Sequence, residues 1–301
     1  MSNLQSQISA IQSRLLPCYP ADEANALAWW IAEELTGLSR TELQFGCKGT
    51  NFSSHMQEIE TIIDRLLHFE PIQYIFGHTL WNGLDLKVTP STLIPRPETA
   101  ELVERINLKS EILNLKSQIH VLDVGTGSGC IAISLKKAHP EWSVTGVDIS
   151  PEAIEVAREN ARRNNVEINF QVADIFSDQM TKYLNKWYMV NDQMVNIVVS
   201  NPPYICESEK VSMRPNVLDY EPSTALFVPD SDPLLFYHRI AELSSMDYRP
   251  STNDQRLIFF EINEAYGPQL SAMLSGLGYT NIQIHKDIYG KPRIIEGRMA
   301  R

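Results

Sequence analysis

Residues 120–133 read HVLDVGTGSGCIAI, and this stretch decides the fold class. An apolar run with the character of a buried strand ends at Val124, glycines occupy positions 125, 127 and 129, and an apolar segment typical of a helix start follows. Glycine suits such a turn because it accepts backbone angles that other residues avoid and lets the chain approach a ligand closely. A strand, a glycine turn and a helix in this order predict a nucleotide-type site at the carboxyl end of a parallel sheet.

Helical and strand patterns alternate along the chain from residue 99 onward. Strand patterns cover residues 143–148, 169–173, 195–200 and 256–261, and helical patterns cover residues 128–138, 151–164, 233–243 and 265–274. This alternation predicts a doubly wound parallel α/β sheet over residues 99–301. Two late strand patterns, 280–286 and 293–297, are expected to add an antiparallel strand at the sheet edge.

The chain before residue 99 has a different pattern. Residues 1–70 carry apolar side chains at helical spacing and predict a small helical bundle. Within it, Asp22 is expected to cap a helix that ends near Gly37, and a later helix is expected to run from about Ser54 to just before Pro71. Residues 71–98 combine alternating apolar residues with the helix-incompatible run LIPRP at 93–97, which predicts a β-hairpin linker.

Composition and charge narrow the class of partner. The 301 residues carry a formal net charge of −11, so DNA or RNA is repelled on average, and a protein or small molecule is favoured. The four cysteines form no C-x-x-C pair and no histidine completes a zinc site, which predicts reduced thiols, no bound metal and a cytoplasmic location. The polar first residues and the lack of an apolar run of about 18 residues argue against a signal peptide and a membrane span.

The spacing of the glycines distinguishes between cofactors. Dinucleotide-binding loops read G-x-G-x-x-G, whereas here the third glycine comes one residue earlier and Cys130 occupies the last position; a P-loop would also need Gly-Lys-Ser/Thr. S-adenosyl-L-methionine carries no phosphate and needs neither geometry, so it is the expected cofactor. Asp123 is expected to accept from its ammonium group, and the loop contacts are expected at Gly125, Thr126, Gly127, Ser128 and Gly129. The alternative is a glycine turn that binds nothing.

Two carboxylates follow the next two strands. Asp148 lies about 20 residues past the glycines, where a carboxylate can hold both ribose hydroxyls, and Ile149 is expected to pack on the adenine. The alternative for Asp148 is a helix cap, but Ser150 suits that role better. Asp174 is expected to accept from the adenine amino group, with a turn-forming aspartate as the alternative.

The strand at 195–200 delivers the tetrapeptide Asn201-Pro202-Pro203-Tyr204 to the same edge of the sheet. An amide or conjugated amine is a poor nucleophile because its lone pair is delocalised. The Asn201 side-chain oxygen and the Pro202 carbonyl can each accept one N–H of such a group, and the two prolines stiffen the backbone that holds them. Tyr204 is expected to offer a flat face to a planar group. The alternative is a rigid turn with an ordinary tyrosine.

The sequence resembles the peptide chain release factor glutamine methyltransferases over nearly its whole length. The matching segments are PIQYIFG at 71–77, LIPRPET at 93–99, the loop at 123–129, NPPYI at 201–205, YEP at 220–222, AL at 225–226, EI at 261–262 and EGR at 296–298. The resemblance implies an N-terminal domain of the five-helix type, a hairpin linker and a seven-stranded, Rossmann-like methyltransferase domain. Ala100 departs from the family by replacing a frequent carboxylate, and Ile175 by replacing an aromatic residue.

The resemblance also implies roles for individual residues. Residues 125–129, Asp148 and Ile175 would contact S-adenosyl-L-methionine, and residues 201–204 would hold the glutamine of the Gly-Gly-Gln motif of a release factor for methylation at N5. Two other functions stay open. One is methylation of the exocyclic amine of adenine or guanine in DNA or RNA, for which the acidic chain offers no evident basic surface. The other is a catalytically silent binding module on the same fold.

Overall fold

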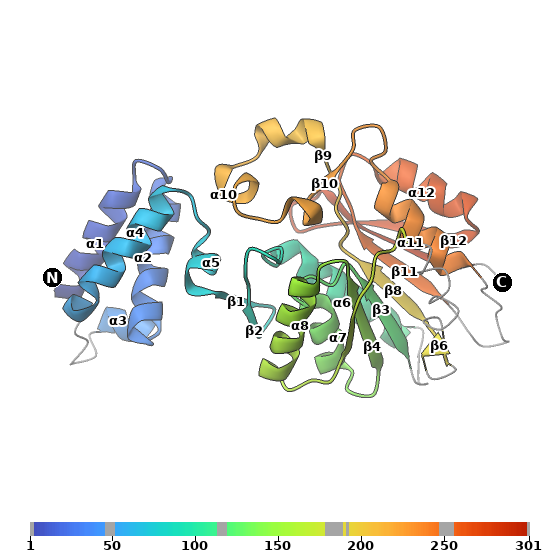
Figure 1. The fold of residues 1–301 in the computed structure, drawn as a ribbon, viewed down its shortest axis with the longest axis horizontal. Coiled ribbons are helices and arrows are strands. Elements are labelled where there is room, and N and C mark those ends of the chain that lie inside the picture. Colours follow the sequence, from blue (N-terminus) through green and yellow to red (C-terminus); the bar gives the residue numbers. More distant parts are fainter. Residues whose placement is uncertain are drawn as a thin grey trace. The chain divides into compact units, whose positions relative to one another are not determined.

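The computed structural model describes residues 3–45, 52–112, 119–177, 189–190, 193–246 and 256–299. The chain divides into two compact units (Figure 1). The first consists of Met1–Gly77 together with Arg214–Tyr220, and the second of His78–Met213 together with Glu221–Arg301. The boundaries expected from the sequence, at residues 70 and 98, stay predictions.

The first unit contains the helical bundle expected from the apolar spacing. Its helices are α1 (Asn3–Leu15), α2 (Ala21–Thr36), α3 (Arg40–Phe45), the 3-10 helix η1 (Phe52–His55), α4 (Met56–Leu67) and α5 (Ile72–Phe76). Residues Leu15, Ile31 and Ile63 of the long helices are fully buried in a shared core. The helix α10 (Pro215–Leu218) belongs to the segment that a distant part of the chain contributes to this unit, where Arg214 donates to Glu23 at 2.9 Å.

The prediction that Asp22 caps α2 was wrong, whereas the helix end near Gly37 is confirmed. Pro20 occupies the capping position without a side-chain cap, and Asp22 lies inside the first turn. A negative side chain is favourable there because the first turn carries the positive end of the helix dipole. Gly37 ends the helix in the left-handed conformation, with a φ of 67°.

A β-hairpin begins the second unit, as the sequence predicted. Strands β1 (His78–Trp81) and β2 (Leu84–Lys87) pair antiparallel around Asn82 and Gly83, which both have positive φ. This two-residue turn matches the twist of the strands it connects. The start of the 71–98 segment differs from an extended linker, because Ile72–Phe76 form the short helix α5 between Pro71 and the left-handed Gly77.

The second unit is built on a seven-stranded sheet in the order β12-β13-β11-β8-β3-β4-β5. Its strands are β3 (His120–Val124), β4 (Ser143–Asp148), β5 (Asn169–Val172), β8 (Ile197–Ser200), β11 (Leu257–Glu261), β12 (Tyr279–Lys286) and β13 (Pro292–Met299). The neighbouring strands β11 and β8, β8 and β3, β3 and β4, and β4 and β5 all pair in parallel, as predicted. The expected antiparallel edge is confirmed: β12 is the edge strand and pairs antiparallel with β13, which lies inside the sheet and pairs antiparallel with β11.

Helices cover both faces of this sheet (Figure 1). They are α6 (Pro97–Ile112), α7 (Cys130–Ala138), α8 (Pro151–Arg163), α11 (Leu235–Ser245) and α12 (Gly267–Gly276). Residues of α6, α7 and α8 share one core with Val121 and Val199, while α11 and α12 share a second core with Leu122 and Val198. Successive strand residues therefore face opposite cores, which is why the central strands are apolar throughout.

Shorter elements follow β5 and β8 along the chain. They are β6 (Met189–Val190), β7 (Gln193–Met194), β9 (Ile205–Cys206), η2 (Glu207–Ser212), η3 (Ser223–Ala225) and β10 (Phe227–Val228). The sequence patterns did not indicate the pairings of β6 with β7 and of β9 with β10, because two-residue strands carry no periodicity. Helix α7 begins at Cys130, two residues later than expected, because Gly129 before it is left-handed.

The close packing around Gly146 of β4 yields a stability prediction. A Cβ at this position would lie 2.6 Å from the ring of Phe170 and 2.8 Å from Thr126 Oγ1. We expect Gly146→Ala to lower the free energy of unfolding by about 1–3 kcal/mol, because the neighbours must shift. Urea unfolding measures the change. Gly276→Ala is the matched control, since beyond its chain neighbours and its own helix backbone no described heavy atom lies within 4 Å of that Cβ; equal effects from both variants would refute the packing argument.

Candidate active site

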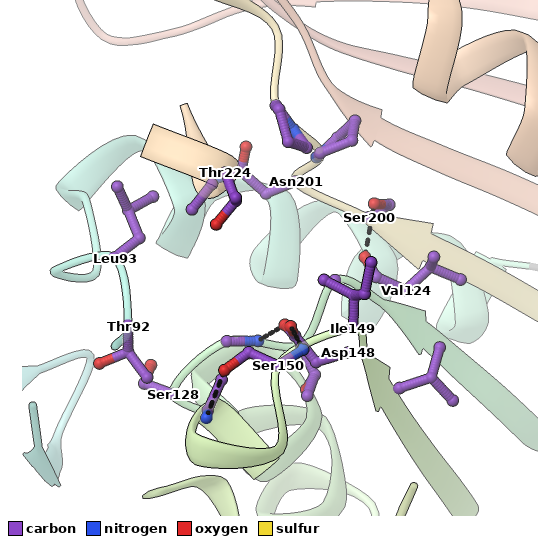
Figure 2. Close-up of a pocket in the computed structure, with 18 of the residues that line it drawn as sticks. Thr92, Leu93, Val124, Ser128, Asp148, Ile149, Ser150, Ser200, Asn201 and Thr224 are labelled. Atoms are coloured by element: carbon purple, nitrogen blue, oxygen red, sulfur yellow. Dashed lines mark hydrogen bonds between the residues drawn. The ribbon is translucent and has the colours of Figure 1, made fainter. Parts of the chain in front are cut away.

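A pocket lies at the carboxyl ends of β3, β4, β5 and β8. Its walls come from the glycine loop, the ends of β4 and β5, the residues after β8, and two further segments within 91–96 and 222–225. Figure 2 shows Asp148, Asn201 and Leu93 around the same hollow, although they come from three separate parts of the chain. The pocket lies where the chain, having added β4 and β5 on one side of β3, adds β8 on the other, which is where open α/β sheets bind ligands.

The glycine loop is fixed to the neighbouring strand by its own backbone. The N–H groups of Gly125 and Thr126 both donate to the Val147 carbonyl, at 2.8 and 2.9 Å. Gly125, Gly127 and Gly129 all have positive φ, which any other residue would adopt only with strain. Residues 124–128 line the pocket, and Gly129 packs beneath it against Ala157 and Phe170.

Asn160, which the sequence patterns did not indicate, also fixes the glycine loop. This side chain is fully buried on α8. Its amide nitrogen donates to the carbonyls of Ser128 and Lys87, at 2.8 and 2.9 Å, and its oxygen accepts from the Lys87 N–H at 2.6 Å. The polar residue on the apolar face of an amphipathic helix was the signal that could have identified it.

Asp123 supports the loop and does not reach the pocket. Its side chain is completely buried, and one carboxylate oxygen accepts from the Thr126 hydroxyl at 2.6 Å. Burial raises the pKa of Asp123 to about 7, against the opposing effect of hydrogen bonds from Thr126 and the Ala132 N–H. The other oxygen, Oδ1, is buried and has no hydrogen-bond partner among the residues that the structure describes. The expected contact between Asp123 and a ligand ammonium group is therefore not supported by its position.

Asp148 lies in the pocket, at the position where a ribose-binding carboxylate was expected. Its two oxygens accept from the N–H groups of Gly127 and Ser150, at 2.8 and 3.0 Å. Burial raises the pKa of Asp148 above its ordinary value, although these backbone hydrogen bonds oppose the shift. Ser150 caps α8 by accepting from the Ala153 N–H, so the alternative role of Asp148 as the cap does not apply. Ile149 lines the pocket and is 59% exposed.

The end of β5 adds an apolar wall that the sequence analysis only partly identified. Asp174 and Ile175 line the pocket as expected, while one Asp174 oxygen also accepts from the Phe176 N–H at 2.9 Å. Phe176 and Phe236 line it as well, and their rings meet edge to face with centroids 5.4 Å apart. An aromatic residue directly after Ile175 was a signal for this wall, whereas Phe236 comes from a distant helix.

The strand β8 brings Asn201 to the pocket beside the glycine loop. The Ser200 hydroxyl donates to the Val124 carbonyl at 2.6 Å, which joins the two strand ends (Figure 2). Asn201, Pro202 and Pro203 all line the pocket. The Asn201 amide nitrogen donates to Thr99 Oγ1 at 3.3 Å, so one end of this side chain is already held by the protein.

Tyr204 does not take the position expected for a flat substrate-facing side chain. It is not among the described residues that line the pocket, and its ring packs against the core beneath α11 and α12. Its hydroxyl donates to Glu261 Oε1 at 3.1 Å. Burial is the main cause that raises the pKa of Tyr204 well above its ordinary value, so this hydroxyl stays protonated as a donor. Its role is therefore to support Glu261.

An ion pair between the partly exposed Arg96 and the buried Glu221 lies at one side of the pocket. Glu221 is 5% exposed, and its carboxylate accepts from the Ile94 N–H at 3.2 Å and from Arg96 Nη2 at 2.7 Å. Trp81 of the hairpin donates to the Arg96 carbonyl at 2.7 Å. These contacts hold the two additional wall segments together, and pairing spares Glu221 the cost of an isolated buried charge.

The described part of the chain contains neither a membrane-spanning helix nor a cluster of metal ligands. No helix there is both long and apolar enough to cross a membrane. Nor do three or more His, Cys, Asp or Glu side chains gather there in a way that could hold a metal ion. Three cysteines, Cys18, Cys130 and Cys206, are free thiols, and Cys47 lies outside the described residues.

Comparisons with known proteins agree with this architecture. Residues 115–227 match a family model described as a methyltransferase domain, and residues 9–77 match one described as the PrmC N-terminal domain. The catalytic domain of hMettl16, solved with an RNA hairpin, superposes with a TM-score of 0.51 at 17% identity, covering 72% of this chain and 76% of that one. At that identity the likeness shows a shared fold alone.

Relatives of known activity match over almost their whole length. The release factor glutamine methyltransferase of Bacteroides thetaiotaomicron is 42% identical over 288 residues, which cover 95% of this chain and 96% of that protein. The enzyme of the same name from Flavobacterium psychrophilum is 41% identical, with 94% of each chain covered. Both the N-terminal bundle and the methyltransferase sheet are included in these matches. The chain therefore belongs to the release factor glutamine methyltransferases, a family of methyl-transferring enzymes.

Proposed function

We propose that this chain transfers a methyl group from S-adenosyl-L-methionine to N5 of the glutamine in the Gly-Gly-Gln motif of peptide chain release factors. The observation that carries the proposal is that Asn201, the glycine loop and Asp148 line one pocket. An amide-binding group therefore lies beside a loop and a carboxylate suited to an adenosyl ligand. The expected site of action is the cytoplasm, a prediction that rests on the cysteine pattern.

The pocket residues fit the proposed cofactor. A carboxylate has about four acceptor positions, so Asp148 retains capacity for ribose hydroxyls after accepting two backbone N–H groups. Ile149, Ile175 and Phe176 provide apolar surface for an adenine ring. The glycine loop offers backbone groups at close approach, and Asp174 keeps one oxygen beyond its turn hydrogen bond. When bound, the cofactor supplies an electrophilic methyl group on a positively charged sulfur.

The protein's own residues orient the substrate amide in this proposal. The Asn201 side-chain oxygen and the Pro202 carbonyl each accept one N–H of the glutamine NH₂ group, which directs the nitrogen lone pair toward the methyl donor. The same acceptors ease the positive charge that develops on the nitrogen. The walls at 91–96 and 222–225, joined through Glu221, limit the access of water.

The second candidate, methylation of an adenine or guanine amine in nucleic acid, is less well supported. A flipped base needs a flat side chain to stack on. Tyr204 was the residue expected to offer that face, yet it contacts Glu261 and packs on the core. The net charge of −11 also opposes the approach of a polyanion.

Transfer of a labelled methyl group tests the proposal directly. We expect the purified chain with labelled S-adenosyl-L-methionine to label a release factor, and mass spectrometry to place the methyl group on the glutamine of its Gly-Gly-Gln motif. A release factor with alanine in place of that glutamine is the control and should stay unlabelled. Transfer to DNA or RNA instead, or to neither, would overturn the assignment.

Asp148 is predicted to hold the cofactor. We expect Asp148→Ala to weaken S-adenosyl-L-methionine binding by about 10- to 100-fold, because hydrogen bonds from ligand hydroxyls to a charged group are lost. Isothermal titration calorimetry measures this affinity. Glu155→Ala, which removes an exposed carboxylate of α8, is the matched control and should bind normally. Wild-type affinity in the Asp148 variant would remove the ribose assignment.

Asn201 is predicted to act on turnover rather than on cofactor binding. We expect Asn201→Ala to lower kcat by roughly 100- to 1,000-fold, because one of two acceptors for the substrate amide is lost. Cofactor affinity, measured by calorimetry on the same sample, should stay within about twofold of wild type, since the remaining pocket is unchanged. A variant that turns over at the wild-type rate would contradict the role of this side chain.

A further inference from the structure

A chain of side-chain hydrogen bonds leads from Asn201 into the protein core. Asn201 Nδ2 donates to Thr99 Oγ1 at 3.3 Å, the Thr99 hydroxyl donates to Glu261 Oε2 at 2.6 Å, and the Tyr204 hydroxyl donates to Glu261 Oε1 at 3.1 Å. Thr99 lies on α6 and Glu261 ends β11, so the chain links three separate elements. Thr99 and Glu261 are 2% and 1% exposed, which removes competition from water.

Glu261 determines which group donates and which group accepts in each of these hydrogen bonds. A carboxylate only accepts, and the 2.6 Å distance from Thr99 is typical of a hydroxyl bound to a charged oxygen. Thr99 has a single hydroxyl hydrogen, which this bond uses. Its oxygen can therefore only accept from Asn201, and the end of the Asn201 amide nearest Thr99 must be the NH₂ group.

We propose that Thr99 is a positioning residue that sets the orientation of the Asn201 amide and so directs its oxygen to the substrate. The inference rests on the proposed function, in which that oxygen accepts an N–H of the glutamine. Rotation of the amide by half a turn would present an NH₂ group to the substrate NH₂ group, and two donors cannot bond to each other. Thr99 excludes that orientation before the substrate arrives, which is a form of preorganisation.

Burial places the pKa of Glu261 above its ordinary value, while two hydroxyl donors and a nearby positive charge favour its charged form. Burial and the nearby Glu98 raise the pKa of Glu261, whereas Thr99, Tyr204 and the positive charge of Arg293 on β13 oppose that shift. Arg293 is itself held by Asp287 Oδ2 at 3.2 Å. Among the described residues, the Cys130 thiol and the Tyr237 hydroxyl also interact electrostatically with Glu261, and burial raises the pKa of both, so neither adds a charge.

Two single substitutions at Thr99 distinguish the effect of its hydroxyl group from the effect of its side-chain shape. Thr99→Val keeps the shape and removes the hydroxyl, and we expect it to lower kcat for release factor methylation about tenfold. Thr99→Ser keeps the hydroxyl and should restore most of the activity. Cofactor affinity should match wild type in both variants, whereas Thr99→Val should lower the melting temperature, because the buried Glu261 carboxylate loses a hydrogen-bond donor. Thr145→Val, at a buried threonine of β4, is the control for loss of a buried hydroxyl.

A double-mutant cycle tests whether Thr99 acts through Asn201. In an Asn201→Ala background, Thr99→Val should change kcat by less than about twofold, because the amide it orients is gone. Three results would overturn the proposal: wild-type kcat in Thr99→Val, equal loss in Thr99→Ser, or multiplicative effects in the double variant.

A neutron crystal structure of the wild-type protein tests the same point without any substitution. Deuterium atoms on the Asn201 atom nearest Thr99 are expected, and their presence on the opposite atom would refute the inference even if Thr99→Val does not fold. Failure of the wild-type chain to label a release factor would instead refute the proposed function. The two failures are thus distinguishable.

Discussion

Parallel pairing of β3 with β8 is the interaction on which the site depends. Residues Val121 to Val124 pair in register with Ile197 to Ser200, and the Ser200 hydroxyl joins the strand ends through the Val124 carbonyl. This register places the first residue after each strand, Gly125 and Asn201, at the same edge of the sheet. A slip by one residue would reverse which side chains of β8 face each of the two apolar cores. The cost of packing those side chains into the wrong core therefore protects the geometry of the pocket.

Buried carboxylates connect the segments that surround this pocket. Glu221 binds the Ile94 N–H and Arg96, which lie 127 and 125 positions away in the sequence, and Glu261 binds Thr99, which lies 162 positions away. Removing one partner of such a contact leaves a buried charge uncompensated, which is strongly destabilising. The segments LIPRPET, YEP and EI, which carried the family resemblance, are therefore parts of one hydrogen-bonded arrangement. Their joint presence in the chain has a physical cause in these shared contacts.

Local patterns were sufficient to predict much of the architecture. Strands 120–124 and 143–148 were predicted with the bounds the structure shows, because apolar runs between turn signals define them. Gly37 is left-handed and ends a helix where the sequence predicted an end. Gly129 is also left-handed, so the next helix begins two residues later than predicted. The place of β13 inside the sheet could not be read in this way, since strand order depends on pairing between residues far apart in the chain.

Residue types and their spacing identified the glycine loop, Asp148 and Asn201, because each lies at the end of a strand or directly after it, and parallel strands end at one edge of a sheet. Burial and partner choice depend on the assembled core, so the roles of Asp123 and Tyr204 were not available from the chain alone. Their positions in the sequence suggested contacts with a ligand. In the structure, Asp123 is completely buried beneath the glycine loop, and the Tyr204 hydroxyl donates to Glu261. Phe236, Asn160 and Thr99 come from helices distant in sequence, and only packing against the sheet brings them to the site.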